Sequence, residues 1–143
     1  MRHEQKIIGV SIHRGVDAQH LAETLNTLAT DGWHVQAVST VLSRKGGAIY
    51  ALKNAYYADT YYLILEISDT RISYRCLLQQ REKDMDEDLA KLNAALEEQA
   101  RDGFSLAHLL HATAISTNEE RQTPGTIAHI LLFAKEESND DDR

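Results

Sequence analysis

Two segments of the chain place apolar residues three and four positions apart, the spacing of a helix with one buried face. These positions are Leu21, Leu25, Leu28 and Ala29 in the first segment, and Leu89, Leu92, Leu96 and Ala100 in the second. Asp17 and Asp84 stand where an N-cap would begin each helix. Gly32 and Gly103 follow the two stripes, and glycine ends a helix in the left-handed region without a Cβ penalty. The pattern therefore predicts two helices, each ending at a glycine.

Six other segments alternate apolar and polar residues, which is typical of half-buried strands. These segments are residues 7–12, 33–41, 61–68, 72–79, 104–114 and 127–133. Residues 68–71 read as a short turn, so we expect the third and fourth strands to form a hairpin.

The chain repeats itself at an offset of about 71 positions, with residues 17–38 matching residues 88–109. Asp31-Gly32-Trp33 falls on Asp102-Gly103-Phe104. The chain thus reads β-α-β-β twice, over about 5–68 and 71–136, within one domain of residues 1–136. We expect an α+β fold in which six strands form one mostly antiparallel sheet, with two helices on one face and a pseudo-twofold axis. Residues 137–143 are expected to be an acidic, disordered tail.

Composition narrows the class of protein. The 43% of hydrophobic residues is enough for a core. The net charge of −7 disfavours a nucleic-acid partner, and the single cysteine excludes a disulfide framework within the chain. No apolar run approaches the length of a membrane span, and the first residues are too polar for a secretory signal, so we expect a cytoplasmic protein with no membrane partner.

The junction between the first helix and the next strand resembles a small family of bacterial and phage domains of unknown function. The family pattern is roughly LN-x-L-x-x-x-G-W-x-x-V, and the matching residues are Leu25, Asn26, Leu28, Gly32, Trp33 and Val35. His34 replaces the acidic residue usual after the tryptophan, and in the second copy the LN pair moves to Leu92-Asn93. The resemblance implies a compact β-α-β-β unit, often paired, and no assigned activity.

No pattern indicates a metal, a cofactor or a catalytic residue. The seven histidines lack HxH or HExxH spacing, and His108 and His111 are three apart on a strand, which sends them to opposite faces. Cys76 lies mid-strand and reads as a buried, inert thiol.

Two loop features allow binding. Arg44, Lys45, Gly46 and Gly47 could form an anion-binding concavity, although a solvated loop is the alternative because the GK[ST] ending of a P-loop is missing. The second feature is a cluster of tyrosines around the same loop, which suits an interface or packing against the chain's own sheet edge. The interface candidates are Tyr50, Tyr56, Tyr57 and Tyr61.

The sheet face away from the helices mixes apolar and polar residues, and such a face usually meets a partner. A small ligand on this face would be held by residues drawn from His34, Gln36, Tyr62, Glu66, Arg75 and His111.

We therefore expect a non-enzymatic interaction module that self-associates, as a homodimer or higher, through the tyrosine-rich loop and the exposed sheet face. One alternative is a protein that binds or sequesters a nucleotide or metabolite, with a phage or defence role. A second is a small hydrolase-like enzyme using His34 or His111 with Glu66, and it ranks last because no nucleophile or paired carboxylates stand at diagnostic spacing.

Overall fold

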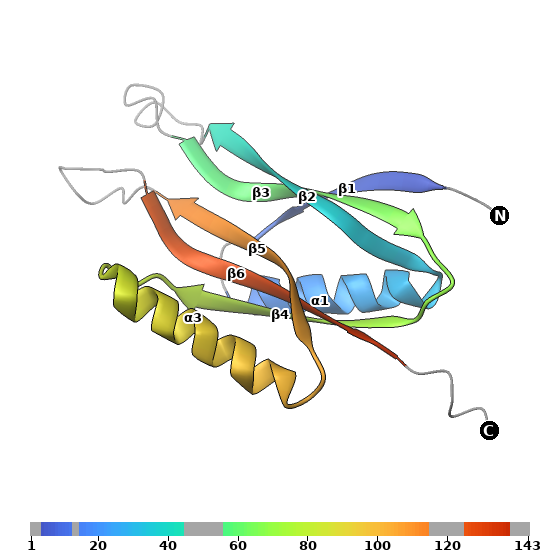
Figure 1. The fold of residues 1–143 in the computed structure, drawn as a ribbon. Coiled ribbons are helices and arrows are strands. Elements are labelled where there is room, and N and C mark those ends of the chain that lie inside the picture. Colours follow the sequence, from blue (N-terminus) through green and yellow to red (C-terminus); the bar gives the residue numbers. More distant parts are fainter. Residues whose placement is uncertain (1–3, 13–14, 45–55, 115–124, 138–143) are drawn as a thin grey trace.

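A computed structural model describes residues 4–12, 15–44, 56–114 and 125–137 (Figure 1). The chain order of its elements is β1 (Gln5–Ser11), α1 (Gly15–Thr30), β2 (Trp33–Arg44), β3 (Tyr56–Ile67), β4 (Ile72–Gln80), α3 (Met85–Ala100), β5 (Ser105–Ala114) and β6 (Gly125–Glu136). The α+β class and both helices predicted from periodicity are confirmed. The expected tail, from residue 138 onward, lies outside the described residues.

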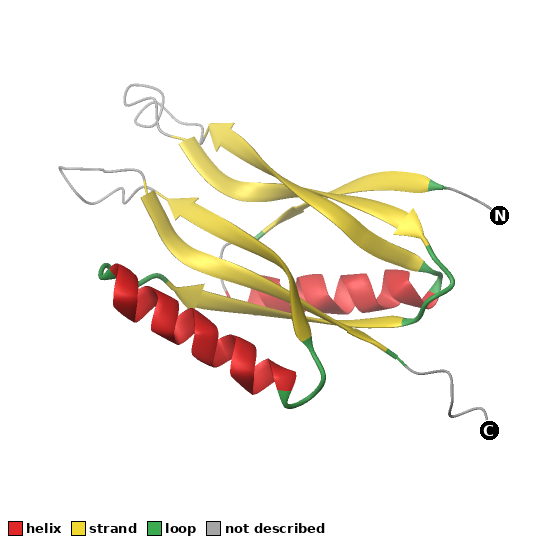
Figure 2. Cartoon of the chain, in the orientation of Figure 1, coloured by secondary structure: helices red, strands yellow, loops and turns green. Residues whose placement is uncertain are grey.

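The strands form two antiparallel three-stranded sheets (Figure 2). One residue pair between β3 and β5 links them, so the expected six-stranded sheet is present only as this narrow connection. Sheet A has the order β1-β3-β2, and sheet B has the order β4-β6-β5. The two sheets meet where Ala58 of β3 pairs with Thr113 of β5. This contact exists because β1 pairs only with residues 60–66 of β3, which leaves the first residues of β3 open to another strand.

The turn at residues 68–71 leads from sheet A to sheet B and does not close a hairpin. β4 pairs along its length with β6, and within the described residues no pairing joins it to β3. The turn chemistry was read correctly, but a turn does not determine which strand the next strand will pair with.

Helix α3 covers one face of sheet B (Figure 1). The buried residues there are Phe104, Leu131 and Phe133, packed against Leu77, Leu92, Ala95 and Leu96. Leu89, which we expected in the buried stripe, is 48% exposed, and the neighbouring Asp88 is buried in its place.

The main core lies on the opposite face of sheet B, between that face, helix α1 and the inner face of sheet A. Its buried residues are Ile12, Ala18, Leu21, Leu25, Tyr61, Leu63, Leu65, Tyr74, Cys76, Leu110, Ala128, Ile130 and Leu132. Sheet B is thus buried on both faces, and the two helices lie on opposite sides of it. The expectation of both helices on one face was wrong, because four consecutive residues of β6, from Ile130 to Phe133, are apolar and need cover on both sides.

The corner that ends each helix has the same geometry in both halves of the chain. Gly32 and Gly103 have φ values of +94° and +89°, and the amide of each donates to the carbonyl three residues earlier. The aromatic residue that follows lies under a cation from the first strand of its half: Lys6 Nζ is 4.4 Å from the Trp33 ring centroid, and the Arg75 guanidinium is 4.2 Å from that of Phe104.

The strand after each corner also bulges at the same point. The register of β2 shifts between Val35 and Ala37, and that of β5 between Leu106 and His108. The extra residues, Gln36 and Ala107, are again about 71 positions apart.

The halves meet through different surfaces. The first half contributes the side of sheet A on which α1 packs, whereas the second half contributes the face of sheet B turned away from α3. A twofold axis would bring the same surface of each half together. The halves are therefore stacked head to tail, and the expected pseudo-twofold relation is not found in this packing.

Asn26 of α1 and Tyr74 of β4 hold this contact together. The Asn26 side chain accepts from the Tyr74 amide at 2.7 Å and donates to the Tyr74 carbonyl at 3.1 Å, as a neighbouring strand would. The Tyr74 hydroxyl in turn accepts from the Val35 amide of β2 at 2.9 Å. One buried tyrosine thus joins α1, β4 and β2.

Valine substitutions at the two corner glycines should each lower the free energy of unfolding by more than about 1 kcal/mol, because both positions have positive φ. The loss should be greater for Gly32→Val, since a Cβ there would lie 3.2 Å from the Ser68 carbonyl oxygen, whereas at Gly103 it meets the flexible Lys135 side chain. Urea denaturation measures both, and a variant with an unchanged midpoint would contradict the corner geometry.

Replacing Asn26 by alanine should destabilise the fold by about 2 kcal/mol or more, because both Tyr74 backbone groups lose their partner at a part-buried edge. Asn93→Ala is a matched control, since Asn93 is an exposed asparagine on α3 and should change stability by less than about 0.5 kcal/mol. Equal losses in the free energy of unfolding for the two substitutions would show that the Asn26 hydrogen bonds do not stabilise the fold.

Candidate interaction surface

The side of sheet A turned away from the core carries an exposed apolar surface, which we call the outer face. Ile7 pairs with Ile64, and Gly9 pairs with Tyr62. Ile7 is 63% and Tyr62 45% exposed, while Ile64 is half-buried. A Cβ on Gly9 would lie 3.4 Å from Tyr62 Cε1, which is contact distance, so the tyrosine ring lies against β1 at this glycine. The result is an apolar centre, bordered by the polar residues Gln5, Ser39 and Glu66.

The six candidate ligand residues do not form one cluster. Tyr62 and Glu66 lie on the outer face, and His34 pairs with Glu66 in the register but is only 4% exposed. Gln36 is the bulged residue of β2. Arg75 and His111 belong to sheet B. A face inferred from alternation alone combined residues from two sheets.

Arg75 has structural partners beside α3. Its Nη1 donates to Gln99 Oε1 at 2.7 Å and to Asp102 Oδ2 at 2.9 Å, and its guanidinium lies over the Phe104 ring. These contacts fix the end of α3 against β4.

Of the candidate interface tyrosines and anion-binding loop residues, one lies in the core, and the others lie outside the described residues or are placed only as backbone. Tyr61 is completely buried and its hydroxyl donates to the His111 carbonyl at 2.5 Å, so it packs within the chain's own core. Tyr50, Lys45, Gly46 and Gly47 lie outside the described residues. Tyr56, Tyr57 and Arg44 are placed only as backbone at the ends of β3 and β2.

A buried polar cluster beside the start of α3 was missed by sequence reasoning. Asp88 Oδ2 lies 2.8 Å from His129 Nε2, and Asp88 Oδ1 accepts from the Glu82 amide at 2.9 Å. The His111 and His129 rings meet edge to face, with centroids 5.4 Å apart and planes at 67°. His129 Nδ1 is buried and has no hydrogen-bond partner within the described part of the chain.

The electrostatics of this cluster follow from burial and hydrogen bonding. The amide of Glu82, followed by the His129 imidazole, lowers the pKa of Asp88 below its ordinary 3.8. Burial lowers the pKa of His111, and the neighbouring His129 lowers it further. Burial likewise lowers the pKa values of His34 and His108.

Cys76 does not extend this cluster into a nucleophilic site. The thiol lies on the opposite face of sheet B, in the main core, and burial raises its pKa to about 12. Such a thiol stays protonated and unreactive. Over the described ranges, no group of three or more histidine, cysteine, aspartate or glutamate side chains is placed to hold a metal ion.

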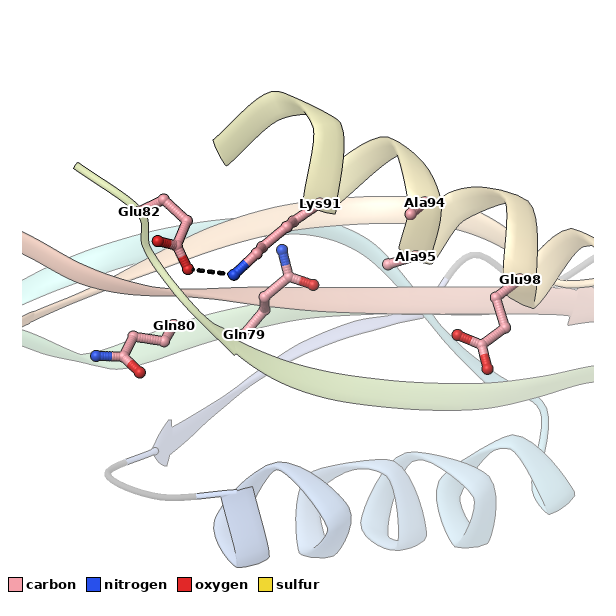
Figure 3. A pocket seen from close by; sticks show the side chains of 7 residues that line it. All are labelled: Gln79, Gln80, Glu82, Lys91, Ala94, Ala95 and Glu98. Atoms are coloured by element: carbon pink, nitrogen blue, oxygen red, sulfur yellow. Dashed lines mark hydrogen bonds and ion pairs between the residues drawn. The ribbon is translucent and has the colours of Figure 1, made fainter. Parts of the chain in front are cut away.

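A cleft of about 350 Å³ lies between α3 and the end of β4 (Figure 3). Its lining residues are Gln79, Gln80, Glu82, Lys91, Ala94, Ala95 and Glu98. Lys91 Nζ bonds Glu82 Oε2 at 2.5 Å, so the one cation of the lining is already paired with a carboxylate. Gln79 Nε2 is buried without a partner among the residues that the structure places.

Comparison of the chain with protein-family models, with curated proteins and with solved structures gives no match. Neither described helix has the length and apolar character needed to cross a bilayer. The resemblance to the bacterial and phage domains therefore stays a prediction.

Replacing Asp88 by asparagine should lower the melting temperature at neutral pH, because the His129 and Glu82 contacts favour the ionised carboxylate. A lowered folded-state pKa gives stability that is fully present above the unfolded value and is lost as the pH falls through the folded value. The gap in melting temperature between wild type and Asp88→Asn should therefore be present at about pH 5 and close as the pH falls below about 3.8.

Asp86→Asn provides the control, since Asp86 is an exposed aspartate in the same helical turn. A gap for Asp88→Asn that stays unchanged down to about pH 3 would mean that the carboxylate charge does not stabilise the fold.

Proposed function

We propose that this chain is a non-enzymatic interaction module that self-associates through the outer face of sheet A. The observation that carries the proposal is the exposure of Ile7 (63%) and Tyr62 (45%) beside Ile64 on the outer face of sheet A. A contiguous apolar patch with a polar border is typical of a protein–protein contact. A second copy of the same chain is the simplest partner, since most soluble oligomers are homo-oligomers.

We also propose that the module arose by duplication of a β-α-β-β unit. Both halves have the first strand at one edge, the last strand in the centre and the middle strand at the other edge. The shared corner glycines, the cation–aromatic pairs and the bulges at matching positions support the same view. A family of paired β-α-β-β domains is the proposed origin.

Two of the candidate residues are already engaged or buried within the fold, which favours an interaction module over the alternatives. Arg75, a candidate for ligand binding, bonds two side chains at the end of α3. His34, one of the two histidines that the hydrolase alternative pairs with Glu66, is only 4% exposed. The net charge of −7 supports a protein partner over a nucleic acid, and one buried thiol suits a reducing cytoplasm.

Sedimentation velocity over about 1–100 μM tests self-association. The wild-type chain should associate in this range, and Ile7→Lys should weaken association at least tenfold because it places a charge in the apolar centre of the contact. Gln19→Lys, on the exposed side of α1, adds the same charge and should leave association unchanged. A wild-type chain that stays monomeric, or an Ile7→Lys variant that associates like wild type, would overturn the proposal.

A further inference from the structure

Because the two halves share strand order and the bulge after each corner, the paired strand residues of one half can be matched with those of the other. Val35 pairs with Leu65, which pairs with Lys6 on the other side; the counterparts are Leu106, Phe133 and Arg75. The same registers make Cys76 and Ile130 of sheet B the counterparts of Ile7 and Tyr62 of sheet A. Counterparts can therefore be compared for burial, residue by residue.

The outer face of sheet A matches a surface that is buried in sheet B. Cys76 is 6% exposed and Ile130 is completely buried, whereas Ile7 and Tyr62 are 63% and 45% exposed. Ile64 is half-buried, and its counterpart Leu132 is completely buried. In sheet B the first half of the same chain supplies the cover.

The surface that supplies this cover has an exposed counterpart as well. In the first half, Ala18 of α1 and the strand residues Val35 and Val38 belong to the main core or pack against it. Their counterparts in the second half are Leu89, Leu106 and Leu109, which are 48%, 36% and 42% exposed. We call these three residues the inserting face.

The exposure of the inserting face has a structural cause. In the first half, sheet B lies against β2, as shown by the bond from the Val35 amide to the Tyr74 hydroxyl. In the second half α3 packs on Leu131 and Phe133 of β6. Within the described residues no further sheet covers β5, so Leu106 and Leu109 stay exposed. The chain thus leaves two complementary surfaces exposed, the outer face of sheet A and the inserting face of the second half.

We infer that copies of this chain associate head to tail, with the inserting face of one copy (Leu89, Leu106 and Leu109) docked on the outer face of the next (Ile7, Tyr62 and Ile64). This contact repeats between chains the packing that joins the two halves within a chain. The inference rests on the proposed self-association and specifies its geometry. A heterologous contact of this kind builds rings or open chains and not a closed twofold dimer.

The contact between copies is weaker than the contact within a chain. Glu97 stands at the counterpart position of Asn26, and Gln5 at that of Tyr74. A carboxylate accepts hydrogen bonds but cannot donate one, so it cannot bond both backbone groups of Gln5 as Asn26 bonds those of Tyr74. The apolar residues carry the association, which therefore depends on protein concentration.

Two single variants and their mixture test the geometry. Ile7→Lys disables the outer face and keeps the inserting face, while Leu109→Lys does the reverse; both residues are exposed, so both variants should fold, which circular dichroism and melting temperature verify. Each variant alone should be monomeric in sedimentation velocity at about 100 μM, where the wild type forms species of dimer size or larger. An equimolar mixture should give a heterodimer of twice the monomer mass and nothing larger, because only one intact pair of surfaces remains.

Each other outcome decides against a stated claim. If Leu109→Lys still forms a homodimer while Ile7→Lys is monomeric, two outer faces pair directly; the head-to-tail inference is then wrong and the proposed self-association stands. If both variants are monomeric and their mixture gives no heterodimer, the two surfaces do not bind one another and the inference is wrong. A wild-type chain that is monomeric throughout would overturn the proposed function and the inference together.

Discussion

The attachment of α1 to the edge of β4 decides the architecture. Asn26 bonds both backbone groups of Tyr74, and the Tyr74 hydroxyl accepts a hydrogen bond from the Val35 amide. Helix α1 and the edge strand β2 of the first half are thereby fixed to β4 of the second half. Burial raises the pKa of Tyr74, which keeps the hydroxyl neutral in this setting. With α1 in this place, the face of sheet B that carries Cys76 and Ile130 is closed, and the matching face of sheet A is left open. The exposure of the outer face follows from that asymmetry.

Local chemistry could be read from the sequence with good accuracy. Apolar periodicity identified both helices and the six strands, and the glycines at the corners have the positive φ that their position demanded. The arrangement of the sheets could not be read in this way. Alternation shows which residues share a face of one strand, but it does not show which faces meet. The continuous apolar run of Ile130–Phe133 was the available signal that sheet B is buried on both sides.

The candidate site residues show the same difference between what one strand determines and what the arrangement of strands determines. Tyr62 was expected on an open sheet face, and it is 45% exposed there. Ile7 and Ile64 lie on the same face, and strand period alone accounts for this. The expected grouping of Tyr62 with Arg75 and His111 assumed that all three side chains point away from the helices. In the structure Tyr62 lies on the outer face of sheet A, whereas Arg75 and His111 lie on the α3 side of sheet B. The pairing of Asp88 with His129 joins residues far apart in the chain, so no local pattern contains it. Leu89 and Asp88 are neighbours on α3 and point about 100° apart around its axis. The orientation of the helix about that axis therefore decides which of them is buried.

The position of Cys76 gives this protein a built-in reporter. Its thiol lies in the core between the two halves and is protonated at any ordinary pH, so alkylating reagents cannot react with it while the halves stay in contact. Its rate of modification therefore measures how often the stack opens, at a site that the chain already carries and without an added label. A cysteine introduced on the outer face would be alkylated faster than Cys76, because it is exposed. Slower alkylation of that cysteine would report association of copies, while the rate at Cys76 would report opening of the contact between the halves.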